Sequence, residues 1–193
     1  LLESKKIDYI RAVELLLIRT KTELNADVRN GLVKTLLPEY LKGSSIVNKE
    51  LCKTLSYLQA TEIIEITLTA MESGKEDESQ KALYLSSDIS QRSEQYGTAV
   101  EEMLKNMPNA QHVSYAKSLA VMTSGWTKEL RTRYFEWYNK ALQKSGGRSY
   151  AQFIRAIQET ALANVPLEDK QFYEALASEA LSDANNFSKG VKQ

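Results

Sequence analysis

Helix-breaking residues are scarce in this chain, and that scarcity constrains its fold more than any other feature. It contains eight glycines and three prolines among 193 residues, which is under half of their usual combined share of roughly 12%. Strands in small domains need frequent turns, and turns depend heavily on these two residue types. The sequence therefore leaves little room for strands and favours helices joined by short connections.

Apolar residues recur at the spacing of a helix face. Ile7, Ile10, Val13 and Leu17 form the first such stripe, because positions three and four apart share one side of an α-helix. The later stripes are Val28/Leu32/Leu36/Tyr40, Leu51/Leu55/Leu58, Ile64/Leu68/Met71, Val113/Ala116/Leu119, Leu130/Tyr134/Trp137/Ala141, Phe153/Ile154/Ile157/Ala161 and Phe172/Leu176/Ala180. The sequence predicts an all-α protein.

Side chains that can accept bonds from free helical N–H groups indicate where several helices begin. Asn25 or Asp27 can begin the second helix, and Thr127 can begin the aromatic helix that follows it. Thr98-x-x-Glu101 and Ser149-x-x-Gln152 have the spacing of capping boxes. These positions divide the chain into about nine or ten helices.

Pairs of these helices span roughly 35 to 45 residues, which is the period of stacked helix hairpins. We expect a right-handed α-α superhelix of HEAT-like hairpins, with a closed globular bundle as the alternative. A short polar turn at Gln59-Ala60-Thr61 is typical of the inside of such a hairpin.

One helical-repeat domain is expected over residues 1–184. Its first part, 1–74, consists of HEAT-like hairpins, and 75–87 is a loop or short helix. Residues 88–184 form an aromatic-rich helical half, and 185–193 read as a polar tail.

Charge and cysteine content exclude several classes of function. The 25 basic and 25 acidic side chains cancel, so nucleic acid is not an expected partner. No apolar run approaches the roughly 20 residues of a membrane span, so membrane insertion is not expected. One cysteine and one histidine cannot make a zinc cluster or a Cys-x-x-Cys-His haem attachment. We expect no catalytic, metal-binding or cofactor-binding residue in this chain, which is then not an enzyme.

The single histidine and cysteine have ordinary structural interpretations. His112 follows Asn109, a candidate helix cap, by three residues and is expected to be structural. Cys52 lies beside Leu51 and Leu55 and is expected to be a small buried hydrophobe. The loop Gly146-Gly147-Arg148-Ser149 lacks phosphate-loop spacing, and a helix end followed by a new cap explains it.

An aromatic cluster is the strongest candidate for a binding surface. Trp126, Tyr134, Phe135, Trp137 and Tyr138 fall within one helix and its cap. Most are expected to be core, because buried aromatics dominate core energetics. Five aromatic rings on one short helix cannot all face inward. The predicted interaction surface therefore comprises Trp126, Phe135, Tyr138 and Arg148, with Phe135 and Tyr138 exposed.

The same region carries a family resemblance. Gly125-Trp126-Thr127, Arg131, Tyr134-Phe135-x-Trp137 and Gly146-Gly147-x-Ser149 stand at fixed offsets. This segment resembles a helical-repeat region of large secreted bacterial proteins that also carry a c-type cytochrome domain. The resemblance implies a periplasmic or secreted location. It also implies that covalent haem, if present, belongs to flanking sequence of the parent protein.

Three functions follow as expectations. The first is a non-catalytic helical scaffold that positions neighbouring domains of a larger protein, which the resemblance implies is an extracytoplasmic, haem-containing enzyme. The second is a stand-alone helical adaptor for a protein partner. The third is a carbohydrate or small-molecule surface on the aromatic helix 127–145.

Overall fold

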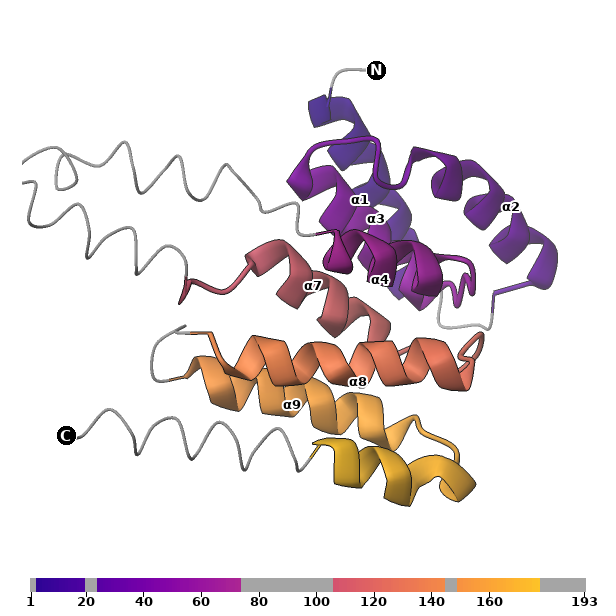
Figure 1. Cartoon of the computed structure of the whole chain (residues 1–193). Coiled ribbons are helices and arrows are strands. Elements are labelled where there is room, and N and C mark those ends of the chain that lie inside the picture. Colours follow the sequence, from indigo (N-terminus) through magenta and orange to yellow (C-terminus); the bar gives the residue numbers. More distant parts are fainter. Residues whose placement is uncertain (1–2, 20–23, 74–105, 145–148, 178–193) are drawn as a thin grey trace, which may run out of the picture.

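The chain is all-helical wherever its structure is described. The structure is a computed structural model, and it describes residues 3–19, 24–73, 106–144 and 149–177. Helices joined by turns account for these residues, and no strand occurs among them (Figure 1). The predicted all-α class is confirmed.

The helices follow one another with short connections. Their bounds are α1 (Glu3–Arg19), α2 (Ala26–Leu36), the 3-10 helix η1 (Leu37–Glu39), α3 (Ser45–Tyr57), α4 (Ile63–Glu72), α7 (Ala110–Leu119), α8 (Lys128–Leu142), α9 (Tyr150–Ala163) and a last helical stretch over 167–177. The predicted loop at 75–87, the capping box at Thr98 and the tail at 185–193 lie outside the described residues, so the total of nine or ten helices stays a prediction.

Most of the predicted caps are present. Asn25 Oδ1 accepts a bond of 2.8 Å from the N–H of Asp27, and Thr127 Oγ1 accepts one of 3.2 Å from the N–H of Leu130. Asn109 Oδ1 accepts from the N–H groups of Gln111 and His112. Each bond satisfies a donor that the first turn leaves free.

The predicted cap at Ser149 is wrong. Its side chain makes no capping bond to α9, and its backbone is already helical, with φ −90° and ψ −10°. A capping hydroxyl needs an extended backbone to fold back onto the first turn. The turn before α9 therefore does not use the side chain that the sequence offers.

The helices pack as two neighbouring rows. In one row α1 contacts α3, α3 contacts α7, and α7 contacts α9. In the other row α4 contacts α8, and α8 contacts residues 167–177 through the Phe135 and Tyr173 rings, whose centroids are 5.1 Å apart. Contacts of α3 with α4 and of α8 with α9 join the rows. Figure 1 shows α7 lying between α3 and α4 on one side and α8 and α9 on the other.

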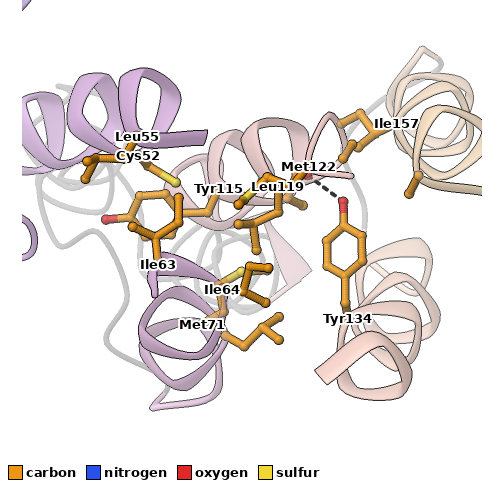
Figure 2. Close-up of a cluster of buried hydrophobic side chains, with 14 of the residues drawn as sticks. Cys52, Leu55, Ile63, Ile64, Met71, Tyr115, Leu119, Met122, Tyr134 and Ile157 are labelled. Atoms are coloured by element: carbon orange, nitrogen blue, oxygen red, sulfur yellow. Dashed lines mark hydrogen bonds between the residues drawn. The ribbon is translucent and has the colours of Figure 1, made fainter. Parts of the chain in front are cut away.

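One continuous hydrophobic core runs between the rows. Figure 2 shows Leu55 of α3 and Ile64 of α4 on one side of Leu119 of α7, with Tyr134 of α8 on the other. The stripe residues Ile10, Val13 and Leu17 are also buried. The core therefore combines stripes from successive helix pairs, as their spacing predicts.

Three stripe positions face solvent against expectation: Val28, Phe153 and Phe172. In the last helical stretch the buried ring belongs to Tyr173, whose hydroxyl donates to the carbonyl of Lys128 over 3.1 Å. That bond and the contact with α8 rotate the buried face by one residue. The spacing of apolar residues alone predicts the buried face of a helix only to within about one residue.

Candidate functional site

The aromatic helix α8 belongs to the core, and the predicted exposure of two of its rings is wrong. Phe135 is 1% exposed and Tyr138 is 0% exposed. Trp126 is half-buried, and its indole N–H donates to the carbonyl of Met122 over 3.0 Å. Arg148 lies outside the described residues. These rings do not form an exposed platform.

Two faces of α8 are covered, which explains the error. The helix packs against α4 on one side and α9 on another, and the Phe135 ring also meets Tyr173. Tyr138 donates to the Tyr134 hydroxyl over 2.6 Å, and Tyr134 donates to the carbonyl of Ala116 over 2.6 Å. Burial raises the pKa of both phenols, so both stay neutral and structural.

Arg131 is a buried cation that the sequence reasoning missed. Its guanidinium lies 5.5 Å from the Trp126 ring and 5.9 Å from the Tyr173 ring. It donates to the carbonyl of Asn164, at the C-terminal end of α9, over 3.2 Å. A cation at a helix C-terminus and over aromatic faces is favourable, so Arg131 joins α8 to the end of α9 and to Tyr173, and the charge of Asp169 also acts on it. The signal available in the sequence was its spacing of three residues from Tyr134.

The two residues with potential reactivity are built into the packing. Cys52 is fully buried, as expected, and burial raises the pKa of its thiol. His112 is half-buried, and burial lowers the pKa of its imidazole. Within the described ranges, no three His, Cys, Asp or Glu side chains gather as metal ligands.

A groove opens between α1 and α2 in the described part of the chain, and we call it the α1–α2 groove. It has a volume of about 600 Å³. Four buried apolar side chains form its floor: Ile10, Leu36, Val47 and Leu51. Its walls and rim are Lys5, Lys6, Tyr9, Thr35 and Glu39. An apolar floor with a few polar groups at the edge is typical of a binding site.

The groove lies where α1 and α2 both pack on α3 and make few contacts with each other. Glu14 of α1 accepts a bond of 2.8 Å from the Thr54 hydroxyl of α3. Only Leu36 of α2 is buried. Tyr40, which follows η1, packs on α4, where its hydroxyl lies 2.8 Å from that of Thr67. A helix that buries so little of itself leaves its neighbour uncovered.

An ion pair on the rim of the groove joins α1 to η1. Lys6 Nζ lies 2.8 Å from Glu39 Oε2. The hydrogen bond and the charge of Lys6 lower the pKa of the Glu39 carboxyl. Lys5, the other cation on the rim, is exposed and makes no ion pair within the described residues. The rim therefore carries one uncompensated positive charge.

Exposed apolar side chains extend the α1 wall of the groove, in the direction away from Lys6. Tyr9 is 51% exposed, and Leu16, seven residues later on the same face of α1, is also exposed. Val28 of α2 is exposed as well. The sequence held one sign of this surface, since α1 has more apolar residues than one buried stripe can use, including the run Leu15 to Ile18.

Comparisons with known proteins add no relative. No family model, curated protein or solved structure matches this chain. The resemblance to cytochrome-containing secreted proteins, and the location drawn from it, therefore stay predictions. In the part of the chain that the structure covers, no helix combines the length and apolar character needed to cross a membrane.

Proposed function

We propose that this chain is a non-catalytic helical interaction module, and that it binds a segment of a protein partner in the α1–α2 groove. The partner is either a neighbouring domain of the same polypeptide or a separate protein. The module's role is to hold that partner in a fixed position relative to the helical stack.

We further propose that the helix pairs form a HEAT-like superhelix. The order of contacts supports this, because α1, α3, α7 and α9 follow one another in one row while α4 and α8 follow in the other. In a stack of hairpins each unit contacts its neighbours in this alternating way. Such a stack is stiff, which suits a part that positions others.

One observation carries the proposed function: the groove stands open at one end of the stack that the described residues form. In the rest of the described stack, the space between rows is filled by large buried side chains such as Tyr115, Tyr134 and Phe135. Between α1 and α2 about 600 Å³ with an apolar floor is left unfilled. Exposed apolar surface beside a polar rim marks interaction sites in soluble proteins.

Site-specific photo-crosslinking in the source cells tests this function. A benzophenone amino acid placed at Tyr9 should crosslink to one protein segment, because its ring lies at the groove wall. The same probe at Tyr57 is the matched control, since that tyrosine is 57% exposed and does not line the groove. Mass spectrometry of the product distinguishes a segment of the same chain from a second protein.

Equal crosslinking from both positions, or none from either, would contradict the proposal. In the first case proteins in the cell contact the groove no more than they contact ordinary exposed surface. In the second, nothing occupies it in the cell.

A further inference from the structure

We infer that the occupant of the α1–α2 groove is an amphipathic α-helix that places an acidic side chain against Lys5. This inference rests on the proposed function, because it names the chemistry of the partner that the groove binds. It depends on the groove's shape, on the apolar walls beyond it and on the charge at its rim.

The shape of the groove favours a helix. Its walls are themselves helices, of 17 and 11 residues, which correspond to roughly 25 Å and 16 Å at 1.5 Å per residue. Three turns of a further helix fit that length. An amphipathic helix in an apolar groove is a recurrent mode of peptide recognition, with anchors at i, i+3 or i+4, and i+7.

The apolar walls repeat that spacing. Tyr9 and Leu16 are seven residues apart on α1, which is roughly 10 Å along its axis. A bound helix with anchors seven residues apart would contact both while its first anchor enters the pocket over Leu36 and Val47. A compact ligand would fill the pocket but leave Leu16 uncovered.

The open side of the groove also argues against a small molecule. Sites for small ligands bury roughly 70–90% of the ligand surface. Here Lys5, Thr35 and Glu39 of the lining are all exposed. A helix needs only one covered face, so an open groove suits it.

The rim selects the charge of the partner. Lys6 is already paired with Glu39 at 2.8 Å, whereas Lys5 has no ion-pair partner among the described residues. A Glu or Asp beside the apolar face of the bound helix can pair with Lys5. A basic residue there would be repelled, which gives the groove discrimination between partners.

The test uses the full chain and three fluorescent, hydrocarbon-stapled 18-residue helices. The first has Leu at one-face spacing and Glu on both flanks of that face. The second has Lys in place of Glu, and the third keeps Glu but carries a central Pro in place of the staple. Fluorescence anisotropy should show that the Glu helix binds about three- to tenfold more tightly than the Lys helix. The Pro-containing peptide should bind at least tenfold more weakly, since Pro breaks a helix.

Variants of the chain locate the binding. Lys5→Glu should reverse the preference between the Glu and Lys helices, while Arg155→Glu, the same charge change on an exposed residue of α9, should not. Thr35→Trp should block the groove and abolish binding. Lys34→Trp, at the exposed neighbouring position of α2, should bind like the wild type. Circular dichroism and urea unfolding of each variant establish that it is folded before binding is compared.

Several outcomes would overturn the inference. Equal binding of the Glu and Lys helices rules out the acidic partner, and equal binding of the Pro-containing peptide rules out a helix. If the chain binds dodecanoate but none of the peptides, the groove is a site for small amphiphiles. If sedimentation shows a dimer that Thr35→Trp abolishes, the groove binds a second copy of the chain. If the Tyr9 crosslink in cells persists in any of these cases, the proposed function stands and only this inference fails; if the crosslink is absent, the proposed function fails as well.

Discussion

Two regions of the described stack, around α8 and around α2, are built from the same kind of element and differ in how completely they close. Around α8, the rings of Tyr134, Phe135 and Tyr138 are buried and fill the space between neighbouring helices. Around α2, only Leu36 is buried, and a Cβ added at Gly31 would meet nothing within 4 Å.

The contrast teaches what closes a pair of helices. Tyrosine rings are long enough to span the gap, and their hydroxyls end on each other or on a carbonyl, as in the bond from Tyr134 to Ala116. On α2 the groove is lined by Leu36 and by the short side chain of Thr35, which leave the space toward α1 unfilled. The closed region around α8 therefore stabilises the fold, and the open region around α2 leaves a surface for binding.

Removing a ring from the closed region around α8 should have the largest effect on stability. Phe135→Ala should reduce the free energy of unfolding by about 3–5 kcal/mol, because it creates a cavity in a tightly packed site. Phe153→Ala is the matched control. That ring is 45% exposed, with Lys117 5.8 Å from its centroid, and its loss should cost under about 1 kcal/mol. Urea unfolding measures both, and similar losses would mean that α8 is not the closed core described here.

The next largest effect is a difference in stability between variants of two arginines of α8. Arg131→Ala should cost about 2–3 kcal/mol, because it removes a charged hydrogen bond to Asn164 and the contacts with two rings. Arg133→Ala removes an exposed ion pair with Glu72, worth about 1 kcal/mol or less. Urea unfolding of the two variants ranks them, and the opposite order would show that Arg131 is not part of the packing.

Two glycines compare the closed and open regions directly. Gly125 has φ +82°, and a Cβ there would lie 2.5 Å from Thr61 in the α3–α4 turn. Gly125→Ala should therefore cost about 1–3 kcal/mol. Gly31→Ala should stabilise the protein by about 0.5–1 kcal/mol, since it adds a helix former where there is open space. Thermal unfolding by circular dichroism measures both, and destabilisation by Gly31→Ala would show that α2 is packed more closely.

The smallest effect concerns pH and the pair that joins α4 to α8. The hydrogen bond and charge of Arg133 lower the pKa of Glu72 below its ordinary 4.5. A lowered folded-state pKa gives stability that is present above 4.5 and lost as the pH falls through the lowered value. Since both groups are partly exposed, Glu72→Gln should cost only a few tenths of a kcal/mol at pH 7 and nothing once Glu72 is protonated.

A double-mutant cycle checks the cause of that effect. In an Arg133→Ala background, Glu72→Gln should not change the free energy of unfolding, either at pH 7 or at a pH low enough to protonate Glu72. A cost that persists without Arg133 would assign the effect of Glu72 to some other contact.

The sequence by itself determined the local structure. Few breakers and apolar spacing predict helices, and the side chains of Asn25, Asn109 and Thr127 cap them as their chemistry allows. These features depend on residues within one or two turns of each other, so a single sequence contains them. Burial of Cys52 followed in the same way from its place on an apolar stripe.

Only the tertiary structure decided which faces are covered. Whether Phe135 and Tyr138 are core or surface depends on how many helices surround α8. That number depends on segments distant in sequence, such as Tyr173 and α4, whose Glu72 is 61 residues from Arg133 of α8. The surplus of apolar residues on α1 is the one sign of the α1–α2 groove in the sequence, and the groove itself results from how α1 and α2 pack on α3. Periodicity gives the apolar side of a helix, but contact between distant elements decides whether that side is filled or left open for a partner.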